Sequence, residues 1–228
     1  IYQNEGFYIG KYETGIENKP KTSSSFSLST EIPVIKQNAY PYVYITNRQA
    51  QMLANTFASD LEGYTSNLIF GIQWNLTLKY LETKGATQAE LKEDSTHWGN
   101  YSNNLWNITN TNSKYSTDSS QTWVSGAYGK KSSNSNVVLS TGASDIFSKQ
   151  GIYDLAGNVG EWTLEISENS NVNSVRGDRY MDVDGAASHC YGYNHEESVG
   201  FIGCRVALYS DQALNTNSNI SEITLTLG

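Results

Sequence analysis

The sequence contains few of the residues that mark disulfide-rich, membrane-spanning or nucleic-acid-binding proteins. Only two cysteines, Cys190 and Cys204, occur in 228 residues. Two are too few for a disulfide framework, and their spacing leaves open whether they pair. No segment approaches the roughly 18 consecutive apolar residues of a membrane-spanning helix, so we expect no membrane insertion. Lysine and arginine number 15 against 23 acidic residues, a net charge of −8. Such a chain repels phosphate backbones, and we expect no nucleic-acid partner.

The composition favours one large domain made of many short strands and turns. Glycine is abundant at 19 residues and proline occurs three times, while 16 tyrosines and five tryptophans can fill a sizeable core. The chain opens at Ile1 without a methionine and shows no signal-peptide pattern. We therefore expect a fragment of a longer protein, whose compartment the sequence leaves open.

Hydrophobic periodicity predicts a strand and a helix near the start of the chain. Residues 6–15 alternate apolar and polar side chains, as a strand does, and residues 17–38 are typical of a surface loop. A helix is expected from about Thr46, a good N-cap residue, and it should end before Gly63.

A second amphipathic helix is predicted within residues 68–85, after a short apolar strand or turn. Its buried face consists of Trp74, Leu78 and Leu81. A brief helical turn is expected at residues 87–94.

Long loops pinned by aromatic side chains are expected at residues 95–145, which are rich in asparagine, serine and threonine. The anchors are Trp98, Trp106 and Trp123. Residues 210–228 begin as a polar linker and end in an alternating, strand-like segment. We assign the domain to residues 1–209 and treat 210–228 as a tail or the start of a further domain.

Two segments have the pattern of a rigid scaffold. In "GIYDLAGNVGEW" (151–162), the Gly157–Asn158 pair suits a tight turn that requires a positive φ. Trp162 is a large apolar anchor, and Glu161 beside it, if buried, must be paired or hydrogen-bonded. The second segment is "GCRVAL" (203–208).

Seven segments in order resemble the formylglycine-generating-enzyme / sulfatase-modifying-factor family over residues 6–209. They are "GFYIGKYETG", a helix after "YVYITNRQA", "GIQWNLTLKYL", "WGNYS", "GIYDLAGNVGEWT", "RG" and "GCRVALY". The resemblance implies an α+β chain with a C-type lectin-like fold of the formylglycine-generating-enzyme type. In that fold two helices pack on short antiparallel sheets with long loops. Gly160 stands where the family has the first tryptophan of its "WEW" pattern, which removes bulk near the loop.

The resemblance also suggests a calcium ion near Asn158 and Glu161, because the matching loop of related enzymes helps to hold one. Both side chains carry oxygens of the type that calcium prefers. The favoured alternative is that they only hydrogen-bond loop backbone, since two donors fall short of the roughly six to eight ligands that calcium takes. No cofactor is assigned firmly.

Oxidases of the family use a pair of cysteines to bind copper, because thiolates suit Cu(I). Alignment on the enzyme pattern puts Asp182 at the first cysteine position and Cys190 near the second. Cys204 stands at a structural phenylalanine position and is expected to face the core. We therefore expect no enzyme. A copper-dependent formylglycine-generating oxidase remains an alternative, and it requires Cys190 to lie close to another thiol. A zinc site from His189, Cys190 and His195 matches no recognised spacing.

Residues 178–198 have the composition of a binding surface. They are rich in tyrosine, histidine, aspartate, serine, asparagine and glycine, and they contain no leucine, isoleucine, phenylalanine or lysine. The segment also resembles the variable region of diversity-generating retroelement proteins, which are C-type-lectin-fold proteins of phages and bacteria. Mutated adenines of asparagine-type codons yield most of the residue types found at 178–195. The plain alternative is an ordinary pair of polar loops.

We predict a non-enzymatic ligand-binding display protein, a retroelement-diversified variable protein of a phage or bacterium. It would lie outside the cell, at a cell surface or on a virion, and would bind a protein or glycan on another cell. A structural module of a larger adhesin or tail protein is the remaining alternative, and the oligomeric state stays open. The candidate ligand-binding residues are Asp178, Tyr180, Asp182, Asp184, Ser188, His189, Tyr191, Tyr193, Asn194 and His195. Of these, we expect solvent exposure on one common face for Tyr180, Asp182, Asp184, His189, Tyr191, Tyr193 and His195.

Overall fold

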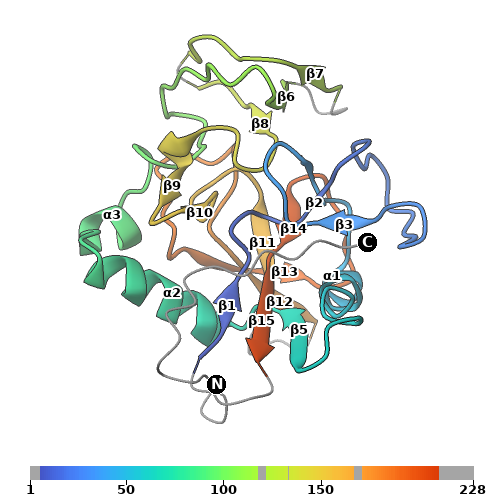
Figure 1. Cartoon of the computed structure of the whole chain (residues 1–228). Coiled ribbons are helices and arrows are strands. Elements are labelled where there is room, and N and C mark those ends of the chain that lie inside the picture. The colour runs from blue at the N-terminus through green and yellow to red at the C-terminus, as the bar shows by residue number, and fades with distance from the viewer. Residues whose placement is uncertain (1–5, 118–121, 133, 167–170, 211–228) are drawn as a thin grey trace.

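The structure is a computed structural model that describes residues 6–117, 122–132, 134–166 and 171–210. A few short helices and many small, mostly antiparallel sheets form a mixed α+β fold (Figure 1). The predicted α+β class is confirmed at this level. No helix among the described residues is long and apolar enough to cross a membrane. The alternating end of residues 210–228 lies outside the described residues.

The helices follow the predicted periodicity. α1 (Asn47–Ala54) begins after Thr46, whose hydroxyl accepts a hydrogen bond from Gln49 N while the Gln49 side chain accepts one from Thr46 N. This reciprocal pair is a capping box, and it confirms Thr46 as the N-cap. α2 (Gly71–Thr83) is the predicted second helix, and α3 (Gln88–Lys92) is the expected helical turn. The buried side chains of α2 include Trp74, Leu78 and Leu81, as predicted.

The strands are short and form five small sheets among the described residues. The four-stranded sheet has the order β13-β12-β11-β14, the three-stranded sheets have the orders β1-β15-β5, β3-β2-β4 and β7-β6-β8, and β10 pairs with β9. Their bounds are β1 Tyr8–Ile9, β2 Gly15–Ile16, β3 Pro33–Val34, β4 Tyr40–Pro41, β5 Tyr64–Leu68, β6 Lys114–Ser116, β7 Val124–Ser125, β8 Val138–Leu139, β9 Ser148–Lys149, β10 Ile152–Tyr153, β11 Gly160–Ile166, β12 Val172–Arg176, β13 Cys190–Asn194, β14 Ile202–Cys204 and β15 Val206–Ser210.

The single strand predicted at residues 6–15 is wrong in its extent, because the chain bends between β1 and β2. Gly10 N still donates a hydrogen bond to Val206 O of the neighbouring strand β15, and Thr14 N donates one to Cys204 O of β14. Between them the side chain of Glu13 turns into the core, where it is fully buried. There the carboxylate accepts hydrogen bonds from Asn158 Nδ2 and Val159 N, as a buried carboxylate requires.

The core surrounds β11, whose Trp162 is fully buried and donates its indole N–H to Ile45 O at 3.0 Å. α1 lies on one side of the central strands and α2 with α3 on the other, while β6, β7 and β8 cover one end (Figure 1). The four-stranded sheet has two outer strands, β13 and β14. Thr14 N bonds to Cys204 O of β14, whereas β13 pairs within the sheet with β12 alone.

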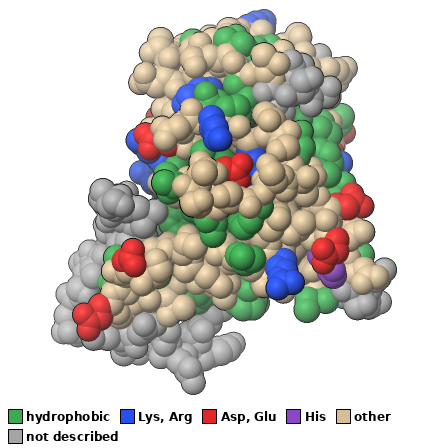
Figure 2. Space-filling view, turned by 90° about the vertical axis from the view of Figure 1, so that its right-hand side faces the viewer, with side chains coloured by type: hydrophobic (Ala, Val, Ile, Leu, Met, Phe, Trp, Pro, Cys, Tyr) green, Lys and Arg blue, Asp and Glu red, His purple; other side chains and the backbone are tan. Residues whose placement is uncertain are grey.

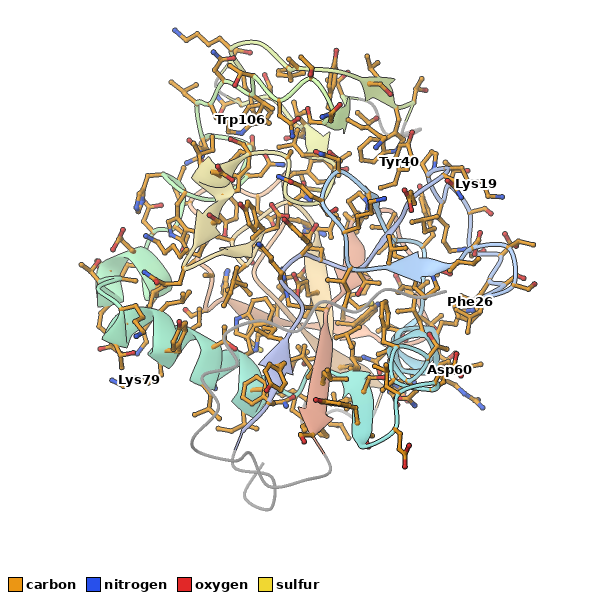
Figure 3. All side chains as sticks on the ribbon, in the orientation of Figure 1. Lys19, Phe26, Tyr40, Asp60, Lys79 and Trp106 are labelled. Atoms are coloured by element: carbon orange, nitrogen blue, oxygen red, sulfur yellow. The ribbon has the colours of Figure 1, made fainter. Side chains whose placement is uncertain are left out.

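Residues 95–145 contain the expected aromatic anchors, but three short strands, β6, β7 and β8, lie among the expected loops. Trp98 and Trp106 are buried, and Trp123 is half-buried. Trp106 lies in the loop region beside β6 and β8 (Figure 3), where its ring packs edge-on against Phe147.

Lys131 is an unexpected anchor of the same loops. Its side chain is fully buried, and its ammonium donates to Tyr101 O at 2.8 Å, Ser102 O at 2.7 Å and Asn104 O at 2.8 Å. A buried cation needs such partners, and three carbonyl oxygens satisfy its three N–H bonds. The backbone at 101–104 is thereby held in one arrangement.

Candidate functional site

The 151–162 segment forms a rigid turn, as its sequence predicts. Gly157 and Asn158 both have positive φ, at 74° and 59°. The buried Asn158 side chain accepts hydrogen bonds from Asn100 Nδ2 at 3.0 Å and Leu139 N at 2.9 Å, and it donates to Glu13 Oε2 at 2.8 Å. Three distant parts of the chain therefore meet at one asparagine.

Glu161 is buried and paired, as the physical argument required. Arg205 Nη2 lies 2.6 Å from its Oε1, and Arg205 Nε lies 3.0 Å from its Oε2. The guanidinium also donates to Gly10 O and Tyr153 O, each at 2.8 Å. One arginine thus ties β11 to β10 and to the loop after β1, and each of its three nitrogens donates to a protein oxygen.

Two more buried carboxylates face this arginine, so the centre of the fold has an excess of acid. Burial raises the pKa of Glu13 well above its usual range and raises that of Asp154 to about 7, while the nearby Arg205 acts to lower both. Burial likewise raises the pKa of Glu161 against the same guanidinium. Arg205 is therefore the cation on which this group of carboxyls depends.

The oxygens suggested for calcium are occupied by protein donors. The Asn158 oxygen accepts from Asn100 and Leu139, and both Glu161 oxygens accept from Arg205. Within the described residues no group of three or more histidine, cysteine, aspartate or glutamate side chains is arranged to hold a metal ion. Hydrogen bonding within the protein accounts for both residues.

The two cysteines lie far apart. Cys190 is on β13 and Cys204 on β14, at opposite edges of the four-stranded sheet. Three strand spacings of about 4.8 Å separate them by roughly 14 Å. Cys204 is buried, as expected, whereas Cys190 is exposed. The two sulfurs can share neither a disulfide nor a metal ion, so the requirement of the oxidase alternative is not met.

Two of the ten candidate residues, Asp178 and Tyr180, are buried, and for Tyr180 this contradicts the expected solvent exposure. Asp178 is 3% exposed and accepts hydrogen bonds from Ala186 N at 3.2 Å and from His189 Nδ1 at 2.7 Å. Tyr180 is 7% exposed and packs against Val159. Both residues support the fold and do not contribute to an exposed surface, because Asp178 closes its own loop and Tyr180 adds apolar volume to the core.

Asp182, Tyr191 and Tyr193 gather around an arginine that was not among the candidates. The Arg179 guanidinium lies 4.4 Å from the Phe201 ring centroid and 5.7 Å from that of Tyr191, and its Nε is 3.1 Å from both Asp182 oxygens. Tyr193 packs edge-on against Phe201 at 6.1 Å. These side chains are half-buried, so they form a stiff, partly exposed aromatic patch rather than a free loop.

The remaining candidates lie along β13 and beside it. Asp184, His189 and Asn194 are exposed, and Ser188 and His195 are half-buried. Asp184 accepts a hydrogen bond from Asn103 Nδ2 at 2.8 Å, which links it to the loop that Lys131 holds. The structure thus divides the ten residues into a buried pair, a patch at Arg179, and a set of exposed polar groups near the outer strand.

Sequence reasoning missed Arg179, Phe201 and the backbone of β13 as parts of this surface. A single arginine among several tyrosines is a sequence signal that could have predicted a cation–π patch. The free backbone edge has no signature in residue types, because it follows from which strand ends the sheet.

Gly160 makes room for one of these tyrosines. A Cβ added at Gly160 would lie 2.7 Å from the Tyr191 hydroxyl and 2.7 Å from Val175 Cγ1. The Tyr191 hydroxyl is buried there without a hydrogen-bond partner among the described residues. Gly160 is therefore matched to a large side chain from the candidate segment.

The face drawn in Figure 2 shows no gathering of basic side chains. Lysine and arginine are scattered there among acidic, hydrophobic and other residues. This face carries no basic stripe of the kind that tracks a phosphate backbone.

Comparisons with known proteins give only distant likenesses. No family model matches the chain, and no curated protein matches it. Similar solved structures include Treponema denticola variable protein 1, with 16% identity, a TM-score of 0.35, and coverage of 65% of this chain and 49% of that one. PvdO from Pseudomonas aeruginosa has 11% identity and a TM-score of 0.44, and the match covers 89% of this chain and 80% of PvdO. CarF has 16% identity and a TM-score of 0.43, and the match covers 74% of this chain and 67% of CarF. The chain spans about half the length of the first of these. At these values the likenesses do not assign a fold family.

Proposed function

We propose that this chain is a non-enzymatic ligand-binding domain with a C-type lectin-like fold of the formylglycine-generating-enzyme type. In this proposal it is a retroelement-diversified variable protein of a phage or bacterium. It acts outside the cell, at a cell surface or on a virion, and binds a protein or glycan on another cell.

One observation carries the proposal, namely the contrast between the two scaffold segments, residues 151–162 and 203–208, and the residues that lie between them. Asn158, Glu161 and Arg205 are fully buried, and protein partners occupy their polar groups. Between them, Asp184, His189 and Asn194 have exposed polar side chains, of which His189 also bonds to the buried Asp178 and Asp184 to Asn103. A rigid frame that presents adaptable polar groups and half-buried tyrosines suits recognition.

A catalytic role has no comparable support. The oxidase chemistry needs two thiolates at one metal, and the cysteines lie at opposite edges of the sheet. Cys204, on the core face, has a pKa raised by burial to about 12, which suppresses the thiolate form.

The proposal is tested by binding of the labelled chain to arrays of bacterial surface glycans and surface proteins. We expect specific binding to at least one array member, and the triple variant Asp184→Ala/His189→Ala/Asn194→Ala should weaken it tenfold or more. The matched control is Lys79→Ala/Lys92→Ala/Glu93→Ala, which changes exposed residues on and beside α2 and α3 and should leave binding unchanged (Figure 3 labels Lys79 on α2).

Two results would contradict the proposal. One is the absence of any specific binding on either array. The other is equal binding by the two triple variants, which would place the interaction away from the 178–198 segment.

A further inference from the structure

The outer strand β13 leaves part of its backbone without partners. Gly177 N bonds to His189 O, and His195 N bonds to Asn171 O. With the register Val175↔Tyr191 and Asn173↔Tyr193, the odd-numbered residues of β13 therefore exchange hydrogen bonds with β12. The N–H and C=O groups of the even-numbered residues, Cys190, Gly192 and Asn194, point away from the sheet.

These outward groups are accessible. Cys190, Gly192 and Asn194 are all exposed. Among the described residues the only bond to an outward backbone group is from Glu197 N to Asn194 O, at 3.0 Å. Within the described ranges, the N–H and C=O groups of Cys190 and Gly192 and the N–H of Asn194 have no hydrogen-bond partner, and we take them as the groups that a ligand can reach.

In the part of the chain that the structure describes, this edge also lacks the usual protection against strand pairing. Natural edge strands are blocked by lysine, proline, a bulge or a covering segment. β13 has the sequence CYGYN with no lysine or proline, and its register with β12 runs without a shift over all five residues. Gly192, at its centre, has no side chain to obstruct an approaching backbone.

We propose that β13 binds an extended basic peptide, which adds to the sheet as a fifth strand beside it. This inference rests on the proposed function and specifies the ligand class of the same surface. The free groups repeat every second residue, about 6.6 Å apart, which is the repeat of an extended peptide backbone and not of a sugar chain. The side chains of the added strand alternate between two faces of the sheet, the face that carries the Tyr193 side chain and the face that carries the Cys190 and Asn194 side chains.

Charge around the strand selects a basic peptide. Glu196 and Glu197 follow β13 directly and are exposed, and Asp184 is exposed beside the same segment. Two arginines lie beside the strand, and each already has a carboxylate partner: Arg176 pairs with Glu165 and Arg179 with Asp182. Among the described residues these exposed carboxylates have no lysine or arginine partner, and Glu196 has only His195, at 3.4 Å. A ligand with lysine or arginine side chains can therefore pair with them, and its encounter rate falls as salt rises.

The test measures binding of a fluorescent peptide, Lys-Val-Lys-Thr-Lys-Val-Lys, by the protein and by two double variants. Cys190→Pro/Asn194→Pro removes two outward N–H groups and keeps every β12–β13 bond, whereas Cys190→Ala/Asn194→Ala removes the same side chains and keeps the N–H groups. We expect the alanine pair to bind within about threefold of the parent. The proline pair should bind tenfold or more weakly, since each lost backbone hydrogen bond is worth about 1 kcal/mol.

A change in the peptide checks the same claim without altering the protein. N-methylation of alternate residues blocks the N–H groups on one edge of the peptide, and N-methylation of the other residues blocks the opposite edge. One methylated peptide should bind as tightly as the unmethylated peptide, and the other should lose tenfold or more in affinity, because a single edge of an added strand faces β13. Equal binding by the two methylated peptides, or no binding of the parent peptide at millimolar concentration, would overturn the proposal.

Three further outcomes reject the inference in different ways. If the array ligand depends on Asp184, His189 and Asn194 but tolerates the proline pair, side chains hold the ligand, and the proposed function stands without strand addition. If the parent protein forms dimers in sedimentation and the proline pair forms monomers, a second copy of the chain occupies the edge. If neither set of variants affects any ligand, the proposed function and this inference fail together.

Discussion

Replacing Arg205 with methionine will lower the free energy of unfolding at neutral pH by about 3–5 kcal/mol, as breaking a buried ion pair does. Glu161 would lose the partner that now lies 2.6 Å away, and two backbone carbonyls, Gly10 O and Tyr153 O, would lose their donor. Because the total free energy of unfolding of a natural domain is only about 5–15 kcal/mol, much of the variant protein should be unfolded at 37 °C. Urea titration followed by tryptophan fluorescence measures the loss.

The same variant should recover stability in acid. Without the guanidinium, burial keeps the carboxyl pKa values raised, so the folded state binds protons that the unfolded state has released. Stability then rises as the pH falls from about 8 towards 5, because protonation removes the uncompensated charge. The control Arg48→Met changes an exposed arginine and should shift stability by less than about 0.5 kcal/mol at either pH. An Arg205→Met protein as stable as the parent at pH 7 would contradict the role given to this pair.

Replacing Lys131 with methionine should cost about 2–4 kcal/mol and loosen the candidate surface. Ser102 O and Asn104 O would be left buried without their ammonium partner. The same loop supports the candidate segment, since Ser102 N bonds to Asp182 O at 2.9 Å and Asn103 Nδ2 bonds to Asp184. Hydrogen exchange should therefore accelerate at residues 101–104 and 178–186 before it accelerates in β11 or β15.

The neighbouring lysine provides the matched control. Lys130 is exposed, so Lys130→Met should leave both the unfolding midpoint and the exchange pattern unchanged. If Lys131→Met raises exchange evenly over the whole chain, the lysine stabilises the fold globally and does not specifically support this surface.

Local patterns predicted the helices because the same residues decide both the pattern and the packing. Thr46 caps α1 by its own hydroxyl, and Trp74, Leu78 and Leu81 lie on the face of α2 that their spacing indicates. The turn at Gly157–Asn158 was predictable in the same way, because its positive φ values restrict the residue types there.

The candidate surface was predicted less well because its geometry depends on long-range partners. Nothing in the residue type of Asp178 indicates that Ala186 N and His189 would hold it in a buried position. Tyr180 has the composition of a contact residue, yet it fills space against Val159. The exposed edge of β13 depends on the order of the strands in the sheet, which composition does not encode.

The most direct test of the central claim, a fixed frame that presents a changeable binding surface, is to sequence this locus in several related isolates. We expect substitutions concentrated at the exposed and half-buried positions of residues 182–195, with Asn158, Glu161, Asp178, Tyr180 and Arg205 unchanged. Substitutions spread evenly over the chain, or an invariant 182–195 segment, would contradict the account.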